Sequence, residues 1–322
     1  MPSCGASWSS VEPPIRVGLP LPGSRGEGQL RRNVDTSVAD LLRQFELERL
    51  EVNLFRGESR DIGSPQVFGG QVLGQALMAA YATVEGRVVH SLHAYFLRRG
   101  DFNAPIVYHV DRGRDGGSIS ARRVVAVQHG EQIFNLAASF QCELPGLEHQ
   151  STMPQVPPPE ELADSRQLDP EVLARLPEKL RRVAFLSAPF EFRPVEQIDF
   201  LRPTRMAPVQ HLWLRARSAV PDNDALHRCL LAYVSDFNLL GTSTLPHGMA
   251  WLSGEVRLAS IDHAMWFHRA PRVDDWLLYA MDSPSASGAR GFSRGSIFTR
   301  DGRLIASVAQ EGMIRVVTRP AG

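Results

Sequence analysis

The hydrophobic positions of this chain follow one pattern twice, a helical stripe and then a series of strands. In the first half, apolar side chains recur at offsets of 0, 3, 4, 7, 8 and 11 residues between Leu73 and Val84, which places them on one face of a helix. The same offsets recur between Leu226 and Phe237. Segments rich in Val, Ile, Phe and Tyr follow each stripe, and Gly-containing turns separate them. A duplicated helix-and-meander unit is therefore expected.

The strand pattern predicts an α+β fold. Strands are expected near residues 88–98, 105–112, 118–128 and 132–141 in the first half, and near 251–269, 274–282, 288–300 and 303–317 in the second. A short helix from Thr36 to about Phe45 and an edge strand around Leu50–Phe55 precede the first stripe. The apolar face of an antiparallel sheet must be covered, and the helix is what covers it. A sheet curled around one long central helix is the hotdog fold, so the repeat predicts a tandem hotdog.

The two copies can be aligned residue by residue. Leu92–Arg99 corresponds to Asp262–Arg269, so that His93 corresponds to His263. The turn at His129-Gly130 corresponds to Asp301-Gly302, and Ala138 then stands where the second copy has Gln310. Polar residues that only one copy contains suggest that this copy keeps the chemistry while the other keeps the architecture.

Composition divides the chain into four parts. Residues 1–35 are dominated by Pro, Gly, Ser and Arg and are expected to be a disordered N-terminal extension, with a transit peptide as the alternative. Residues 36–143 form the expected N-terminal hotdog and 191–318 the C-terminal one. Between them, residues 144–190 are a Pro-rich connector with a polar helical stretch from Glu160 to about Arg182. Prolines do not fit a sheet ladder, so this segment is expected to be a spacer over the surface.

The charge and cysteine content exclude several classes of function. The 322 residues carry a formal net charge of zero, so neither nucleic acid nor an anionic membrane is an expected partner. The three cysteines are scattered, which argues against a disulfide framework or a zinc site and favours a reducing compartment. The C-terminus has no peroxisomal tripeptide, so a cytoplasmic location is expected. No metal or other cofactor is expected.

Asp236 is a polar residue beside an apolar helix face. It lies ten residues after Leu226, which places it about 80–90° from the centre of the stripe. That position is next to a strand edge rather than in open water. A solvated helix carboxylate, or a cap for the break at Gly241, is the favoured explanation of Asp236 when the residue is considered alone.

Gln310 and Ser260 are two further polar residues on strands. Gln310 interrupts an apolar face formed by the even positions of Ala306–Val316, where an unbonded amide costs about 1–3 kcal/mol. A satisfied core amide is the alternative. Ser260 precedes Ile261-Asp262-His263, and no Gly-x-Ser-x-Gly elbow surrounds it, which argues against a nucleophilic serine.

The histidines and glycines indicate no metal and no nucleotide loop. His90, His93, His263 and His268 lack HExxH spacing and a neighbouring cysteine cluster. His93 and His263 are interpreted as half-buried residues whose hydrogen bonds are satisfied. Gly69-Gly70-Gln71 opens the first helix, and its amide protons and dipole can face a carbonyl oxygen or an anion.

Several long motifs resemble the acyl-CoA thioesterase II family. They are Val67–Ala76, Val89–Phe96, Ser118–Val124 and Ile261–His268, and the resemblance extends from about residue 37 to residue 316. It implies a tandem hotdog, an acyl-CoA substrate and at least a homodimer. It also implies a catalytic group of an Asp, a Thr or Ser and a Gln, which fall here on Asp236, Ser260 and Gln310. Gly70, Gln71 and His90 lie within these motifs and are the expected substrate-binding residues.

The expected reaction is hydrolysis of acyl-CoA to a fatty acid and CoA by a water that Asp236 activates and that Ser260 and Gln310 position. Covalent catalysis by Ser260 lacks an evident base. Two other functions stay open, an enoyl-CoA hydratase-like hotdog enzyme and a hotdog protein that binds acyl-CoA without catalysis. A hydratase needs a paired Asp and His, and no such pair stands beside Asp236 in the sequence. The sequence does not indicate a preferred acyl chain length.

Overall fold

The computed structural model describes residues 38–62, 64, 66–165, 189–199, 202–250 and 253–317. The extension predicted for residues 1–35 lies outside them. So does most of the helix predicted from Glu160, of which the described part contains only a single 3-10 turn, Pro159–Glu161. None of the helices in the described part of the chain is long and apolar enough to cross a membrane.

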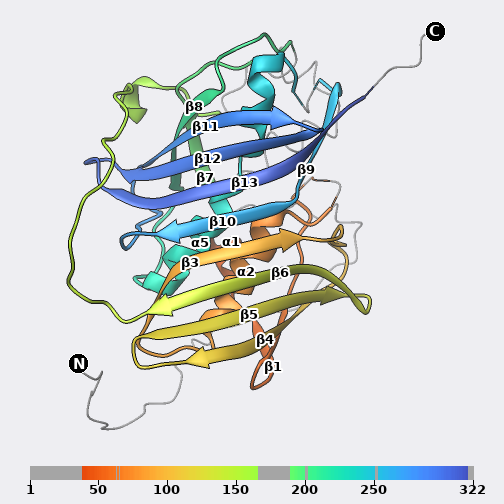
Figure 1. Cartoon of the computed structure of the whole chain (residues 1–322), viewed down its shortest axis with the longest axis vertical. Helices are drawn as coiled ribbons and strands as arrows, with labels where there is room; N and C mark the ends of the chain where they lie inside the picture. The colour runs from red at the N-terminus through yellow and green to blue at the C-terminus, as the bar shows by residue number, and fades with distance from the viewer. Residues whose placement is uncertain are drawn as a thin grey trace, which may run out of the picture. The chain divides into compact units, whose positions relative to one another are not determined.

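The described strands form one antiparallel sheet that contains both halves of the chain (Figure 1). The first half contains α1 (Val38–Gln44), β1 (Glu48–Glu51), β2 (Leu54–Gly57), α2 (Gly69–Tyr81), β3 (Val88–Phe96), β4 (Ile106–Asp115), β5 (Ile119–Gln128) and β6 (Glu131–Gln141). The second contains β7 (Phe190–Pro194), β8 (Val209–Ala216), α5 (Asp224–Ser235), the 3-10 helix η2 (Leu240–His247), β9 (Val256–Ser260), β10 (Asp262–Phe267), β11 (Leu277–Ser287), β12 (Arg290–Thr299) and β13 (Leu304–Val316). The strand order is β1-β2-β4-β5-β6-β3-β10-β13-β12-β11-β8-β7, and β9 also pairs with β13.

Apart from the helix predicted from Glu160, the predicted helices and most strands are confirmed, and the main differences are as follows. The expected edge strand is a hairpin of β1 and β2, because the chain turns at Val52 and Asn53. The second helix ends at Ser235, so Phe237 lies beyond it. Strands β7 and β8 were not predicted. They pair with each other at the edge of the sheet, and β8 also pairs with β11.

The two halves join through β3 and β10, which lie side by side in the middle of Figure 1. Ala264 pairs with His93. Leu92 and His263 are both fully buried, whereas His93 is exposed and its ring lies 5.3 Å from that of Trp266. The alignment of His93 with His263 is therefore wrong by one residue, and His263 takes the inward position of Leu92. Both strands contain the pair His-Ala, and the alignment matched these two pairs. It thereby ignored the alternation of inward and outward side chains, because a shift of one residue exchanges the two faces of a strand.

Helices α2 and α5 pack against each other on the side of the sheet that faces away from the viewer in Figure 1. Two glycines of α2 permit this close approach. A Cβ at Gly70 would lie 2.2 Å from the Tyr233 carbonyl oxygen, and one at Gly74 would lie 2.9 Å from the carbonyl oxygen of Cys229. The backbones of the two helices therefore touch, and the N-terminal end of α2 lies beside the C-terminal end of α5.

The described part of the connector, residues 144–165, packs against the outer face of the second half. Trp213, Leu278 and Phe298 are buried on the face of β8, β11 and β12 opposite to the helices. They pack against Met153, Val156 and Leu162 of the connector. The Trp213 indole also donates a hydrogen bond to the Pro157 carbonyl at 2.9 Å. Residues 144–165 therefore shield these apolar side chains from water on the face of the sheet that the helices do not cover.

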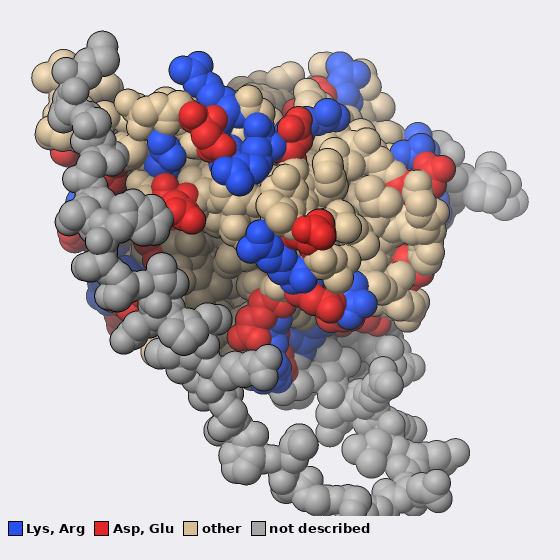
Figure 2. Space-filling view, turned by 90° about the horizontal axis from the view of Figure 1, so that it is seen from below, with Lys and Arg blue, Asp and Glu red and all other residues tan. Residues whose placement is uncertain are grey.

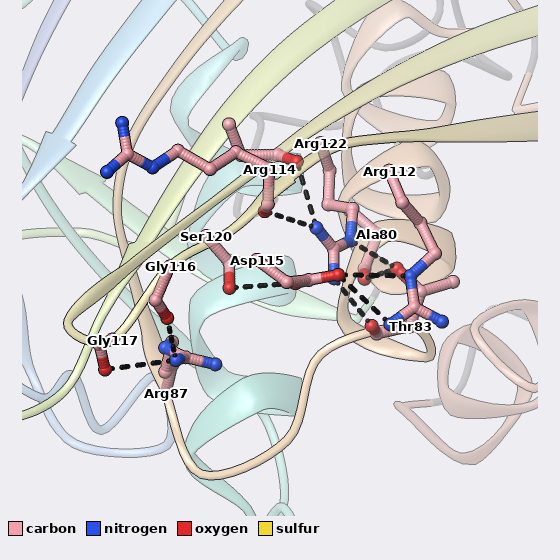
Figure 3. A network of polar contacts seen from close by, with 11 residues as sticks. Ala80, Thr83, Arg87, Arg112, Arg114, Asp115, Gly116, Gly117, Ser120 and Arg122 are labelled. Atoms are coloured by element: carbon pink, nitrogen blue, oxygen red, sulfur yellow. Dashed lines mark hydrogen bonds and ion pairs between the residues drawn. The ribbon is translucent and has the colours of Figure 1, made fainter. Parts of the chain in front are cut away.

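Arg122 ties the end of α2 to the β4–β5 hairpin (Figure 3). Its side chain is buried, and its guanidinium donates to Thr83 Oγ1, to the carbonyls of Thr83, Arg114 and Ala121, and to the Asp115 carboxylate. The nearby Arg122 charge and hydrogen bond hold the pKa of Asp115 at about 2. Because every donor is used within the fold, we assign Arg122 a structural role.

Replacing Arg122 by Met is expected to lower the free energy of unfolding by about 2–4 kcal/mol, because buried carbonyls lose their donor. Urea unfolding measures the change. The matched control is Arg123→Met, since Arg123 is the neighbouring residue and is exposed. Turnover by the folded variant should equal that of the wild type. An Arg122→Met protein of unchanged stability would contradict the structural role.

The face shown in Figure 2 carries acidic and basic side chains next to one another. Elsewhere on the described surface, Arg290 pairs with Glu311 and Arg294 with Asp282. An extended region of one sign, which a phosphate backbone would need, is not present on the face in Figure 2.

Candidate active site

Asp236 lies where the two helices meet. It follows the last residue of α5, and its side chain is only 6% exposed. The Gly70 backbone N–H at the start of α2 donates a hydrogen bond to the carboxylate. Gly69 is also close, since a Cβ there would be 2.7 Å from Asp236 Oδ2. A carboxylate from the second half is therefore held at the positive end of a helix from the first half.

The pKa of Asp236 is raised to about 6. Burial is the main cause, because it penalises the charged form. The hydrogen bonds from Gln310 and from the Gly70 amide lower the pKa and offset only part of this effect. A carboxylate with such a pKa is ionised at neutral pH and is a stronger base than a solvated one, which is what a general base requires.

Gln310 is bonded directly to Asp236. Its side chain is 1% exposed, and Nε2 donates to Asp236 Oδ1 at 2.7 Å. The Oε1 atom is buried, and no hydrogen-bond partner for it exists among the described residues. Ser293 lies opposite Gln310 on β12, and its buried hydroxyl likewise has no partner within the described part of the chain. The site thus contains unused polar atoms next to the carboxylate.

His263 belongs to the same cluster and was not predicted to do so. It was interpreted as half-buried, but it is fully buried, and Gln310 Nε2 lies 3.1 Å from its Nδ1. Its Nε2 lies 3.0 Å from Ser235 Oγ. Burial lowers the pKa of His263 to about 3, so the imidazole is neutral. The available signal was its position in the Ile261–His268 motif, three residues after Ser260.

Ser260 is near the cluster but is not hydrogen-bonded to it. It is the last residue of β9 and pairs with Gly312, two residues after Gln310 on β13. Ser260 therefore lies on the same face of the sheet as Gln310. Its side chain is half-buried. Among the described residues, no hydrogen bond joins its hydroxyl to Asp236 or to Gln310.

The three predicted substrate-binding residues occupy different surroundings. Gly70 is part of the cluster through its amide. The Gln71 side chain is buried and bonded to the loop after β2, donating to the Glu58 carbonyl at 3.2 Å and accepting from the Arg60 amide at 3.3 Å. His90, on β3, is half-buried and lies 2.8 Å from Ser139 Oγ. The structure therefore joins only Gly70 directly to Asp236.

Two models of one protein family match the chain. A model of the acyl-CoA thioesterase family matches residues 181–313, and a model of the acyl-CoA thioesterase N-terminal domain matches residues 56–141. The chain belongs to the acyl-CoA thioesterase family. The two matches contain the two sides of the cluster, since Gly70 lies within residues 56–141 and Asp236, His263 and Gln310 lie within residues 181–313.

Individual acyl-CoA thioesterases resemble the chain over most of its length. The human protein acyl-coenzyme A thioesterase 8 is 44% identical, over 91% of this chain and 93% of its own. Acyl-CoA thioesterase 2 of Haemophilus influenzae is 42% identical, over 86% of this chain and 97% of its own. The crystal structure of an acyl-CoA thioesterase II, TesB2, from Mycobacterium marinum superposes with a TM-score of 0.71 at 43% identity, covering 86% of this chain and 98% of that one. A hot dog fold protein from Alicyclobacillus acidocaldarius, 18% identical, matches with a TM-score of 0.69 and supports the fold alone.

Proposed function

We propose that this chain hydrolyses acyl-CoA to a fatty acid and CoA by attack of a water that Asp236 deprotonates. The observation that carries the proposal is the buried Asp236 carboxylate, with a pKa of about 6, bonded to both Gly70 and Gln310. Membership of the acyl-CoA thioesterase family supports the thioester substrate. A carboxylate in this state serves as a base rather than as a surface charge.

The reaction needs one base and one position for negative charge. The water oxygen attacks the thioester carbonyl carbon while Asp236 accepts the water proton. The resulting oxyanion re-forms the carbonyl and expels the CoA thiolate, which receives that proton from Asp236. We assign the oxyanion to the N-terminal end of α2, where the helix dipole favours negative charge. No covalent bond to the protein forms in this scheme.

Gln310 and Ser260 are proposed to position the water. The Oε1 atom of Gln310 is free to accept one of the water hydrogens. Ser260 faces the same side of the sheet as Gln310 and offers a half-buried hydroxyl. Gln71 and His90 are proposed to line the substrate side of the site, Gln71 through the loop that it holds in place.

The finer architecture is part of the proposal. We propose a tandem hotdog, with α2 as the central helix of residues 36–143 and α5 as that of residues 191–318. The connector, 144–190, packs on the second unit through its described part. We further propose a homodimer or larger homo-oligomer, because exposed sheet edges need covering. A cytoplasmic location fits the free, buried thiol of Cys229.

The pH dependence follows from the raised pKa of Asp236. Only the ionised carboxylate accepts a proton, so kcat/KM for acyl-CoA is expected to fall about tenfold per pH unit below a midpoint of about 6 and to level off above about pH 7. The measurement is the rate of CoA release between pH 4.5 and 8.5, approximate limits within which the fold must be shown to persist. A midpoint near the value of a solvated carboxylate, about 4, would contradict the assignment.

The proposed function is tested by release of free thiol from acyl-CoA substrates of several chain lengths. A hydrolase releases CoA with turnover. A module that only binds acyl-CoA shows saturable binding without thiol release, and a hydratase consumes enoyl-CoA but leaves the thioester intact. Absence of thiol release at every chain length would overturn the proposal.

A further inference from the structure

His263 lies behind the catalytic amide rather than beside the substrate. It is on β10, fully buried, and faces α5 and β13. Its Nδ1 is 3.8 Å from Asp236 Oδ1, beyond hydrogen-bond distance, whereas Gln310 Nε2 is within reach of both atoms. Any effect of His263 on the carboxylate therefore passes through Gln310.

The hydrogen bonds around His263 have one consistent direction. The Ser235 hydroxyl has a single hydrogen, which it donates to the Ala232 carbonyl at 2.9 Å. Ser235 Oγ must therefore accept from His263 Nε2, which carries the imidazole hydrogen. The other ring nitrogen, Nδ1, is then an acceptor and receives a hydrogen from Gln310. Burial keeps the imidazole neutral, so this acceptor persists over the working pH range.

This direction fixes the orientation of the Gln310 amide. Its NH2 group has two hydrogens, and Asp236 Oδ1 and His263 Nδ1 take one each. The opposite orientation would place Oε1 against a carboxylate oxygen and against a nitrogen lone pair, so both hydrogen bonds would be lost and replaced by repulsion. Without His263, a water or a rotated amide could take over one of these positions. With it, Oε1 is left unpartnered and buried beside Asp236.

We infer that His263 is a positioning residue, which holds the Gln310 amide so that its NH2 faces Asp236 and its carbonyl oxygen remains free for the attacking water. This inference rests on the proposed function, since it assigns a part in the same reaction. His263 itself contacts neither water nor substrate in this role. The chain Ser235–His263–Gln310–Asp236 extends from α5 through β10 and β13 back to the end of α5.

Two substitutions of His263 separate positioning from packing. In His263→Asn the amide oxygen can stand where Nδ1 stood and accept from Gln310, so kcat should remain within about 5-fold of the wild type. In His263→Gln the side chain can reach Ser235 but provides no acceptor at the Nδ1 position, so kcat should fall about 30- to 100-fold with KM changed by less than about 3-fold. Loss of the ordered NH2 group should also move the acidic limb of the pH profile to higher pH, because the Gln310 hydrogen bond lowers the pKa of Asp236.

His227 provides the matched control. It is also buried, on α5, and its Nδ1 accepts from the Val273 amide rather than from a residue of the cluster. The same two substitutions there should alter stability without distinguishing Asn from Gln in kcat. Equal kcat values for His263→Asn and His263→Gln would overturn the inference.

Nitrogen NMR of the wild-type protein, labelled in histidine, keeps the inference testable if a variant does not fold. The expected state of His263 is neutral with the hydrogen on Nε2, and a hydrogen on Nδ1 would overturn the inference. Asp236→Asn is measured in parallel. If the wild type turns over, Asp236→Asn does not, and His263→Gln equals the wild type, only the role of His263 fails. If the wild type releases no thiol, the proposed function fails independently of the NMR result.

Discussion

Replacing Asp236 by Asn is expected to lower kcat for acyl-CoA hydrolysis by about 10³-fold or more, because the amide cannot accept the proton of the attacking water. The side chain keeps its size, and its oxygen can still accept the hydrogen bond from Gln310. Binding of acyl-CoA should therefore change little. Thiol release measured under single-turnover conditions, together with calorimetric titration of a non-hydrolysable acyl-CoA analogue, distinguishes lost chemistry from lost binding. Turnover near that of the wild type would remove Asp236 from its role.

The same variant should be more stable than the wild type at pH values at which the buried Asp236 carboxylate of the wild type is ionised. The pKa of Asp236 is raised by folding, so its protonated form contributes stability that is fully present below about pH 4 and is lost as the pH rises through about 6. Asn does not ionise, so the variant does not lose this stability as the pH rises. The stability of Asp236→Asn relative to the wild type should therefore rise by about 2–3 kcal/mol between pH 4 and pH 8. The control is Asp224→Asn, at the other end of α5, where the carboxylate is paired with Arg228.

Replacing Gly70 by Ala is expected to damage both the fold and the site. The added Cβ would lie 2.2 Å from the Tyr233 carbonyl, a backbone atom that can yield only if α5 moves away from α2. The expected cost is about 3 kcal/mol in the free energy of unfolding. Because the Gly70 amide also donates to Asp236, kcat should fall about tenfold or more in the molecules that remain folded.

Gly113→Ala is the control for this substitution. The nearest atom to a Cβ at that position is the Ala121 carbonyl oxygen, at 3.9 Å, which is ordinary contact. Urea unfolding and thiol release are measured on both variants. A Gly70→Ala protein with the stability and kcat of Gly113→Ala would mean that the helices do not touch at this point.

The sequence predicted much of the fold because periodicity reports which face of an element is buried. The stripes from Leu73 and from Leu226 correspond to α2 and α5, and the Asp-Gly and His-Gly turns separate observed strands. Strands β7 and β8 were missed because the repeat was aligned only from the helical stripe onwards, although they stand in the second half where β1 and β2 stand in the first. Phe190–Pro194 ends in a proline and lies at the sheet edge, so the local pattern of residues does not mark it as a strand.

The site was less predictable than the fold because its parts are distant in sequence. Asp236 and Gln310 attracted attention as polar residues beside apolar faces, and the structure joins them at 2.7 Å. The partnership of Asp236 with the Gly70 amide depends on how two helices pack, which no local pattern reveals. His263 was missed because the repeat was aligned on a shared His-Ala pair rather than on alternation. The role of Ser260 stays a prediction.

In the proposed reaction, water attacks the thioester and Asp236 is the base. The most direct test is a single turnover in oxygen-18 water with enzyme in excess over acyl-CoA, followed by mass spectrometry of the fatty acid and of the peptide that contains Asp236. We expect the label to enter the fatty acid and the Asp236 peptide to stay unlabelled, since the carboxylate only accepts a proton. Label in the Asp236 carboxylate, or an acyl group trapped on Ser260, would show that a side chain attacks first and would overturn this mechanism.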